Sequence, residues 1–534
     1  MPTILELLRQ NKKDEIWKEC CGFIDLSVRG FMDVQKQLLL EQIELLGQCE
    51  LGKKIMGGEA PRSVEEFRKK VPLTTYKDYL PYLDEKREDV LPERPYAWAH
   101  TSGRSGEYAF KWVPYTKAMV DMMPKNIFAS IIFSSCRTRG DVNIEEGDIL
   151  LYATAPPPYV SGVIIRAVDD QGVLRILPSV EEAEQMDFFT RMAEGFRMSM
   201  EMGMDFFGGI TSVLVRISRQ FEEGLRGRNR TSTKLSPRLI YKLLRGKIKS
   251  TLAGRPFLPR DLWRLKGIVC GGSDTSIFKD KVFHSWGRMP LEAYGSTECG
   301  GSFATQTWNY KGMTFFPGIC FLEFIPEEES RRSRADTGYK PRTLLLDEVK
   351  PNEKYELVMT SFRGGIYTRY RIGDMIKVVS LEDEELNIRL PQIVFESRVD
   401  DIIDLADFAR LTEKTIWRAI EDAGISYEDW TARKEYIGES PVLHVYIETK
   451  DGDARDIEQR VHQNLRELDS SYAEVEDILH LSPLKVTLLS EGTFNRYFKE
   501  RQAAGADLGH LKPPHMNPPA EIMDKLMQMS KWKI

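Results

Sequence analysis

The order of hydrophobic and polar positions along this chain predicts an α/β protein. Short apolar runs predict buried strands at residues 148–154, 265–273 and 290–294. Apolar residues at helical spacing predict helices over 118–133 and across most of 180–220. The last two apolar runs lead into glycine, which favours parallel strands that deliver loops to one edge of a sheet, where α/β proteins bind ligands.

Two other parts of the first 400 residues carry different patterns. Residues 5–46 have apolar positions at helical spacing and predict two helices with a break near Gly30. Residues 321–325 and 355–360 are short apolar or alternating runs, which predict strands of a more antiparallel layer.

The composition changes near residue 400, and the rest of the chain predicts a small α+β unit. Helices are predicted over 412–423 and 456–468, with a strand at 443–448 between them. We therefore expect two domains. Residues 1–399 would form a large α/β domain of mixed sheets with packed helices and a smaller β layer, and residues 400–534 a small α+β domain.

Composition and charge exclude several classes of protein. The 75 basic and 81 acidic residues give a net charge of −6, which argues against a nucleic-acid partner. No stretch is long and apolar enough to span a membrane, and the charged first 22 residues do not resemble a signal peptide. Seven scattered cysteines form no paired framework, so we expect a cytoplasmic protein with free thiols and no membrane partner.

Residues 101–111 hold the densest cluster of candidate chemistry. Two glycines, two serines and a threonine lie within the first six positions, between two predicted strands. Glycines let a backbone approach a polyphosphate closely, and hydroxyl residues supply donors, so the segment could be a phosphate loop. It lacks the Gly-Lys-Ser/Thr step of the Walker type, and a hydrophilic hairpin turn is the alternative interpretation.

Five later positions suit a bound nucleotide. Gly271 and Gly272 would let the backbone approach a flat ligand, Tyr294 could stack on a base and Glu298 could hold Mg²⁺. The alternative for Tyr294 and Glu298 is the rim of a turn. Asp374 lies between two strand-like runs, where a hairpin turn is ordinary, yet its carboxylate could also accept hydrogen bonds from both ribose hydroxyls.

Two segments leave a structural and a functional interpretation open. Six methionines lie between residues 186 and 204, and helices this rich in methionine either line an adaptable apolar pocket or form ordinary core. Residues 226–260 are strongly basic. A solvated face is the default interpretation of that run, ahead of a patch for nucleic acid or cofactor phosphate.

Taken in order, these stretches resemble the motifs of the adenylate-forming superfamily of acyl-CoA synthetases, peptide-synthetase adenylation domains and luciferases. One such motif would be weak, but five in the same order are a strong signal. They are residues 101–111, 271–272, 294–298, 370–374 and 398–400. Within the superfamily the chain is most similar to the auxin-responsive acyl-acid amido synthetases. That similarity is carried by residues 71–82, 321–326, 355–360 and 492–494, with the later Lys512 and Pro514.

The resemblance implies two groups of residues around ATP. The first would form the loop around the ATP phosphates: Ser102, Gly103, Ser105 and Gly106. The second would flank the adenine: Gly271, Gly272 and Tyr294.

The resemblance also implies which residues take part in catalysis and which allow the small domain to move. Thr297 would touch the α-phosphate, and Glu298 would serve Mg²⁺. Asp374 would hold the ribose with Arg398 near it. Asp400 would be the hinge about which the small domain rotates over the active site, and Lys512 would reach the reacting carboxylate and the α-phosphate.

The activity implied by the resemblance is ATP-dependent ligation of a carboxylic acid. The acid would form an acyl-adenylate with release of pyrophosphate, and the acyl group would pass to an amine, expected to be that of an amino acid, with release of AMP. Residues 160–163, the methionine-rich helices and residues 300–303 would line a pocket for an apolar or aromatic acid.

Two alternatives to amide synthesis stay open. The first is transfer of the acyl group to the thiol of coenzyme A or of a carrier protein. The second is a non-catalytic binding protein on the same fold, against which the joint presence of Glu298, Asp374 and Arg398 argues.

Three positions depart from the family pattern. Arg104 stands where the family usually has a small hydroxyl residue, and Lys111 lies further beyond Gly106 than the usual lysine. His515 follows Pro514 where arginine is usual, so Lys499 is an alternative to Lys512 as the mobile lysine.

Overall fold

The computed structural model describes most of the chain, and its contacts divide the chain into two units. The described residues are 2–102, 110–222, 236–271, 275–399, 401–405, 409–437, 440–450, 452–473, 483–503 and 514–531. The larger unit comprises Met1–Thr101, Lys111–Ile372 and Ile376–Phe395, and the smaller comprises Ser102–Phe110, Gly373–Met375 and Glu396–Ile534. The predicted domain boundary at residue 400 falls outside the described residues and stays a prediction.

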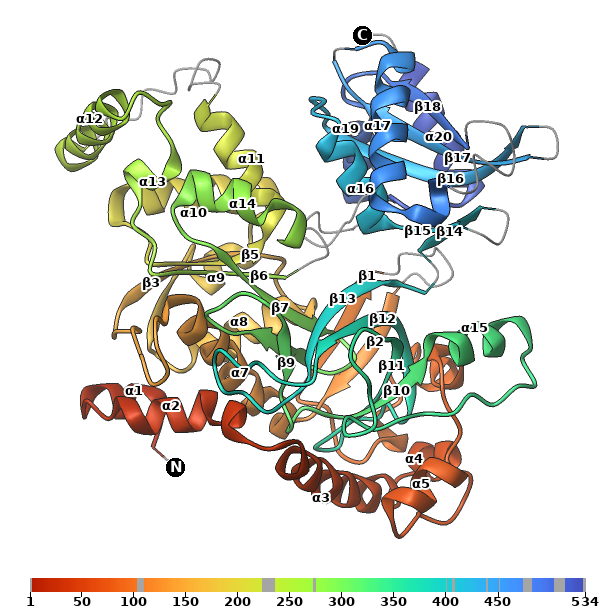
Figure 1. The fold of residues 1–534 in the computed structure, drawn as a ribbon. Helices are drawn as coiled ribbons and strands as arrows, with labels where there is room; N and C mark the ends of the chain where they lie inside the picture. The colour runs from red at the N-terminus through yellow and green to blue at the C-terminus, as the bar shows by residue number, and fades with distance from the viewer. Residues whose placement is uncertain are drawn as a thin grey trace. The chain divides into compact units, whose positions relative to one another are not determined.

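Within the described residues the largest sheet has 11 strands (Figure 1). Its parallel part consists of β3 (Asp148–Ala153), β4 (Leu174–Leu177), β5 (Phe206–Ile210), β6 (Gly267–Gly271) and β7 (Pro290–Ser296). Its other strands are β8 (Gly301–Gln306), β9 (Met313–Phe315), β10 (Cys320–Pro326), β11 (Lys354–Ser361), β12 (Tyr370–Ser380) and β13 (Gln392–Arg398). The order across the sheet is β10-β11-β12-β13-β9-β8-β7-β6-β5-β3-β4.

This architecture confirms the predicted α/β class. The strands predicted at 148–154, 265–273 and 290–294 are β3, β6 and β7. Those predicted at 321–325 and 355–360 are β10 and β11, which pair antiparallel. The two strands predicted around residues 101–111 are β1 (Ala97–Ser102) and β2 (Phe110–Tyr115), which form a sheet of their own.

Helices cover both faces of the parallel strands (Figure 1). α7 (Lys117–Ser135) and α8 (Val160–Asp169) lie on one face. α10 (Phe188–Met202), α11 (Thr211–Glu222) and α14 (Thr275–Trp286) lie on the other, as right-handed crossovers require when the strand order reverses after β4. The helix predicted over 118–133 is confirmed as α7, which begins where the Thr116 hydroxyl accepts a hydrogen bond from the Met119 amide at 3.1 Å.

Two predicted elements are wrong in detail. The N-terminal helices are α1 (Ile4–Arg9), α2 (Lys13–Cys21) and α3 (Val28–Leu46), so the break precedes Gly30. Ser27 is the cause, because its hydroxyl caps α3 by accepting from the Gly30 amide at 3.1 Å. Within 180–220, β5 interrupts the predicted run of helix.

The hairpin expected around Asp374 is also wrong. β12 runs through this position without a turn. Gly373 adopts φ +81° inside the strand, and its carbonyl oxygen accepts a hydrogen bond from the Val399 amide at 2.9 Å. A positive φ is easily adopted by glycine, so the dipeptide marks an irregular strand here.

The smaller unit is the predicted α+β fold. Its three-stranded sheet contains β16 (Asp429–Ile437), β17 (Ser440–Glu448) and β18 (Leu484–Leu489), and β14 (Ile402–Leu405) pairs with β15 (Ala409–Thr412). Its helices include α16 (Glu413–Asp422), α17 (Ala454–Leu468), α19 (Thr493–Ala503) and α20 (Ala520–Lys531). The helices predicted over 412–423 and 456–468 and the strand at 443–448 are confirmed.

A buried histidine links the last part of the smaller unit to its core. His515 is 3% exposed, and its ring stacks on Trp430 with centroids 4.3 Å apart. Its Nδ1 lies 2.7 Å from a Glu413 carboxylate oxygen and its Nε2 lies 2.8 Å from an Asp429 carboxylate oxygen. Burial alone would lower the pKa of His515, but the hydrogen bonds and charges of the two carboxylates raise it to about 9.

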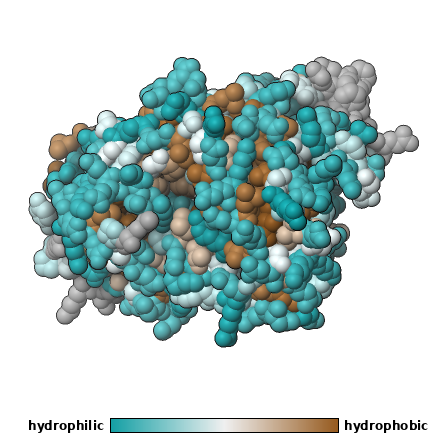
Figure 2. Space-filling view, turned by 90° about the horizontal axis from the view of Figure 1, so that it is seen from below, coloured by the Kyte–Doolittle hydropathy of each residue, from teal (hydrophilic) through white to brown (hydrophobic). Residues whose placement is uncertain are grey.

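The molecular surface, the helices and the cysteines can each be compared with what the sequence leads us to expect. Figure 2 shows that the face seen from below is mostly hydrophilic, with hydrophobic residues gathered near its middle. None of the helices in the described residues has the length and apolar content to cross a membrane. All seven cysteines are free and buried, which confirms the expected free thiols.

Candidate active site

The carboxyl ends of β6 and β7 lie at one edge of the sheet. The two strands are parallel, with Ile268 opposite Pro290, so the residues that follow each strand emerge on the same side. β6 ends at Gly271 and β7 ends at Ser296. This is the arrangement that the strand-then-glycine pattern predicts.

Two glycines at this edge have different surroundings. Among the described atoms, a Cβ at Gly271 would meet only the carbonyl oxygen of Ala293, at an ordinary contact distance of 3.5 Å. A Cβ at Gly295 would lie 2.5 Å from the carbonyl oxygen of Gly301, where β7 and β8 approach at a shift in register. Strand packing therefore requires Gly295, whereas the backbone at Gly271 has room beside it for a ligand.

The turn after β7 is held from both sides by distant residues. The Ser296 hydroxyl accepts from the Cys299 amide at 3.2 Å, which closes the turn locally. The Tyr115 hydroxyl, at the end of β2, donates to the backbone oxygen of Thr297. The Ser361 hydroxyl, at the end of β11, donates to the backbone oxygen of Glu298 at 3.0 Å. These bonds fix the position of the Glu298 backbone.

The side chain of Glu298 is largely buried at this turn. The residue is 7% exposed, and no residue that the structure describes gives its carboxylate a hydrogen bond or an ion pair. Burial raises the pKa of Tyr115, and the charge of Glu298 raises it further. A carboxylate that has no protein cation beside it is suited to coordinate a metal ion. Glu298 is thus more deeply buried than the turn-rim interpretation expects.

Within the described residues, Glu298 offers one carboxylate at this turn, and no complete set of protein ligands surrounds it. Among them, no group of three or more His, Cys, Asp or Glu could hold a metal ion. Mg²⁺ is commonly held by one or two carboxylates together with substrate phosphates and water. The donor set therefore fits a magnesium ion that arrives with a phosphate ligand.

Tyr294 lies on β7 beside this turn. Its ring packs against Phe303, with centroids 4.5 Å apart, and against Phe395, at 5.7 Å. The residue is 8% exposed. Tyr294 is therefore largely a core residue in this structure, and its stacking on a base stays a prediction.

Asp374 and Arg398 form an ion pair within the smaller unit. The Arg398 Nε lies 3.2 Å from a carboxylate oxygen of Asp374. Asp374 is buried, whereas 43% of the Arg398 side chain is exposed. The two residues that the resemblance assigns to the ribose are thus brought together.

Three family models match this chain in order along its length. They are the GH3 family N-terminal domain over residues 21–167, the GH3 family central domain over 313–398 and the GH3 family C-terminal domain over 412–520. Together they cover well over half of the chain. The chain belongs to the GH3 family.

The curated relatives in the GH3 family are distant. The jasmonoyl-L-amino acid synthetase JAR4 of Nicotiana attenuata is 25% identical over 48% of this chain and 44% of that protein. The indole-3-acetic acid-amido synthetase GH3.17 of Arabidopsis thaliana is 20% identical over 90% of both chains. In most such matches the chain spans less than half the length of the curated relative.

Solved structures share the fold of this GH3 chain. The acyl acid amido synthetase AtGH3.15 in complex with 2,4-DB superposes with a TM-score of 0.71 over 96% of both chains, at 17% identity. A 2-hydroxyisobutyryl-CoA ligase in the postadenylation state superposes with a TM-score of 0.56 over 94% of this chain and 91% of that one, at 14% identity. These likenesses confirm the two-domain fold that the resemblance implies.

Several residues predicted for the GH3 site are not described. Gly103, Ser105, Gly106, Gly272, Asp400 and Lys512 lie outside the described residues. Ser102 is described as the last residue of β1. The alternative lysine, Lys499, lies exposed on α19. The roles of these residues stay predictions.

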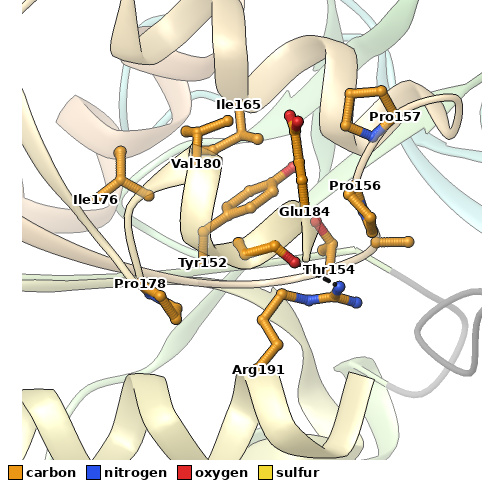
Figure 3. Close-up of a pocket in the computed structure, with 12 residues that line it drawn as sticks. Tyr152, Thr154, Pro156, Pro157, Ile165, Ile176, Pro178, Val180, Glu184 and Arg191 are labelled. Carbon is orange, nitrogen blue, oxygen red and sulfur yellow. Dashed lines mark hydrogen bonds between the residues drawn. The ribbon is translucent and has the colours of Figure 1, made fainter. Parts of the chain in front are cut away.

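The pocket in Figure 3 shares only part of the lining expected for the acyl pocket, since Arg191 belongs to a methionine-rich helix. It lies between β3, α8 and α10, and Arg191 points into it from α10 (Figure 3). Its volume is about 20 Å³, enough for about one water molecule. None of residues 160–163, 300–303 or the six methionines lines it. The acyl pocket of this GH3 protein therefore stays a prediction.

Buried ion pairs beside β12 are a feature that the sequence did not reveal. Arg369 donates to both carboxylate oxygens of Glu323, at 2.9 and 2.8 Å. Arg371 donates to both carboxylate oxygens of Glu356, at 2.9 and 2.6 Å. Although burial opposes the charged form, Arg371 holds the pKa of Glu356 below its usual value. Each guanidinium therefore already has a bidentate partner, including that of Arg371, the arginine of the 370–374 motif.

Proposed function

We propose that this GH3 protein is an ATP-dependent acyl-acid amido synthetase. It converts a small carboxylic acid into an acyl-adenylate, releases pyrophosphate, and transfers the acyl group to the amine of an amino acid with release of AMP. The named GH3 relatives are amido synthetases of jasmonoyl and indole-3-acetic acid type. The observation that carries the proposal is Glu298, a largely buried residue at the end of β7 whose carboxylate has no partner among the described residues.

The first step needs positioning and not a protein nucleophile. A carboxylate oxygen of the acid attacks the α-phosphorus of ATP, and the bond to the bridging oxygen of the β-phosphate breaks. Thr297 contacts the α-phosphate, and the loop of Ser102, Gly103, Ser105 and Gly106 binds the other phosphates. Most of the barrier is lowered by holding the two reactants in line and neutralising their charges.

Five further residues are proposed to bind the rest of the nucleotide. Gly271, Gly272 and Tyr294 flank the adenine. Asp374 accepts hydrogen bonds from the ribose hydroxyls, and Arg398 orients this carboxylate. Glu298 would hold Mg²⁺, which would supply positive charge to the phosphates.

The second step transfers the acyl group. The amine nitrogen attacks the acyl carbon, the bond from that carbon to the AMP oxygen breaks, and the nitrogen loses a proton. Lys512 contacts the reacting carboxylate and the α-phosphate in the first step, and rotation about Asp400 exposes the adenylate to the amine in the second. An apolar or aromatic acid suits a pocket formed by residues 160–163 and 300–303 with the methionine-rich helices. A reducing cytosol suits the seven thiols.

A screen of acids tests the proposal. Purified protein, ATP and Mg²⁺ are incubated with a panel of small apolar and aromatic acids, and pyrophosphate is measured. We expect release that depends on at least one acid of the panel. If no acid gives release and ATP does not raise the melting temperature, the protein is a non-catalytic member of the fold.

A further inference from the structure

The inner face of the basic helix α12 (Pro237–Leu252) is packed against its neighbours. Leu239, Gly246 and Ser250 are buried and lie on one side of the helix. A Cβ at Gly246 would lie 2.6 Å from the ring of Phe257, so the helix approaches the following segment closely. The Lys242 ammonium donates to the backbone oxygens of Met200 and Glu201 on α10, each at 3.3 Å. These contacts fix which face of α12 points outward.

The outer face of α12 is an apolar strip. At ~100° per residue, the exposed apolar side chains fall within an arc of roughly 120° opposite the buried side. They are Ile240, Tyr241, Leu244, Ile248 and Leu252, whose exposed fractions run from 44% to 84%. Among the described residues, these are five of the fourteen large hydrophobic residues that are exposed. Such a concentration on one helix marks a contact surface.

Basic side chains border the apolar strip on both sides. Lys247 lies on one margin, and Arg245 and Lys249 lie on the other, all three exposed. The sequence from residue 237 to 260 contains no acidic residue, although the whole chain has a net charge of −6. Figure 1 shows α12 at the edge of the larger unit, beyond α10 and α13 (Pro259–Leu262). The outer face of α12 is therefore an apolar strip with cationic margins, although the whole chain carries a net negative charge.

We propose that α12 binds an anionic lipid surface. A helix with an apolar strip between rows of Lys and Arg lies in the plane of a bilayer interface, with the strip in the acyl boundary and the cations at the headgroups. The long stems of Lys and Arg let their charges reach the headgroups while the apolar residues are buried. The cationic margins favour an anionic surface over a second copy of the same strip, whose margins carry the same charge. No membrane partner is expected from the sequence, which predicts no spanning segment, but a helix that lies on the surface needs none, so this proposal departs from that expectation.

Vesicle cosedimentation of the full chain tests this proposal. Vesicles of phosphatidylcholine containing phosphatidylglycerol are compared with vesicles of phosphatidylcholine alone. We expect binding to the anionic vesicles, weakened by salt, and little binding to the neutral ones. Replacing Leu244 and Ile248 together by serine should lower the partition coefficient by about tenfold or more, because each loses a buried apolar side chain.

A matched variant controls for general loss of surface hydrophobicity. Phe283→Ser with Leu381→Ser removes two apolar residues of similar exposure elsewhere on the larger unit, 51% and 44%, and should leave vesicle binding unchanged. The proposal fails if the wild-type chain does not bind anionic vesicles, or if the Leu244 and Ile248 variant binds as well as the wild type. It also fails if light scattering shows a dimer that this variant dissociates while vesicles are not bound, because a second copy then covers the strip.

Discussion

Glu298 is fixed through its backbone, whereas its carboxylate has no partner in the described part of the chain. Tyr115 and Ser361 hold the turn through backbone oxygens, so the side chain can be changed without disturbing these bonds. We expect Glu298→Gln to slow acid-dependent pyrophosphate release by about 10²- to 10³-fold, or about 2 to 4 kcal/mol, the effect of losing one electrostatic contact. The melting temperature should not fall, because the carboxylate makes no hydrogen bond or ion pair with the described residues that the change could break.

Two further variants accompany the Glu298→Gln measurement, one as a control and one as a test of a second site residue. Glu384→Gln removes an exposed carboxylate of the larger unit and should leave the rate unchanged. Asp374→Ala should reduce the rate by a similar factor to Glu298→Gln. Full pyrophosphate release in both site variants would show that the site is wrongly assigned.

His515 gives the smaller unit a pH-dependent stability. An unfolded histidine has a pKa near 6.5, and the folded value is raised to about 9 by Asp429 and Glu413. The stabilisation is therefore fully present below about pH 6.5 and is lost as the pH rises through about 9. Its size is on the order of 3 kcal/mol. We expect the difference in unfolding free energy between wild type and His515→Gln to shrink over this range.

Denaturant titrations of the full chain at a series of pH values measure this difference. The variant carries every other titratable group of the wild type, so their contributions cancel in the comparison. A difference that stays constant from neutral pH to above pH 9 would mean that His515 is not held as a cation.

At the level of elements, Gly162 fixes where α8 meets the proline loop after β3. A Cβ at Gly162 would lie 2.0 Å from the Pro157 nitrogen and 2.2 Å from the Pro156 carbonyl carbon. Both are backbone atoms, so the helix or the loop would have to move. We expect Gly162→Ala to destabilise the protein by about 1 to 3 kcal/mol or more, seen as a lower melting temperature.

Gly22→Ala is the matched control for this packing effect. Its nearest neighbour would be the Lys18 side chain at 3.9 Å, and its φ of −62° suits alanine. The control should melt at the wild-type temperature or slightly above it. Equal melting temperatures for both alanine variants would contradict the packing argument.

The elements themselves were predictable where periodicity was strong. The long helix α7 and the apolar strands β3, β6 and β7 follow directly from the pattern. β5 was missed because Gly208 and Gly209 are poor strand formers, yet a Cβ at Gly209 would lie 2.8 Å from the Cβ of Ala153, so close packing against β3 requires glycine. Local propensity cannot anticipate a neighbouring strand that excludes side chains.

At the scale of the whole molecule, all seven cysteines should react slowly with thiol reagents in the native state. Each is buried and free, and burial raises the pKa of Cys20 and of Cys136 to about 12. The thiolate is the reactive form, so a thiol reagent should label native protein slowly and label about seven groups after denaturation. Rapid labelling of native protein would show that the core around these thiols opens.

The candidate site was predictable only in part. The order of the motifs led to Glu298, Asp374 and Arg398, and the ion pair between the last two is present. The residues that hold Glu298 in place were not predictable, since Tyr115 and Ser361 lie 182 and 63 positions away from the backbone groups they bind. These hydrogen bonds depend on tertiary contacts between distant segments, and no periodic pattern in a single sequence predicts such contacts.

The identity of the product tests the central claim most directly. The protein is incubated with ATP, Mg²⁺, an acid that supports pyrophosphate release, and both an amino acid mixture and coenzyme A, and the products are analysed by mass spectrometry. The account predicts AMP and an amide whose mass equals acid plus amino acid minus water, both formed about 10²- to 10³-fold more slowly by the Glu298→Gln variant. An acyl-CoA thioester without amide, or ADP in place of AMP, would contradict it.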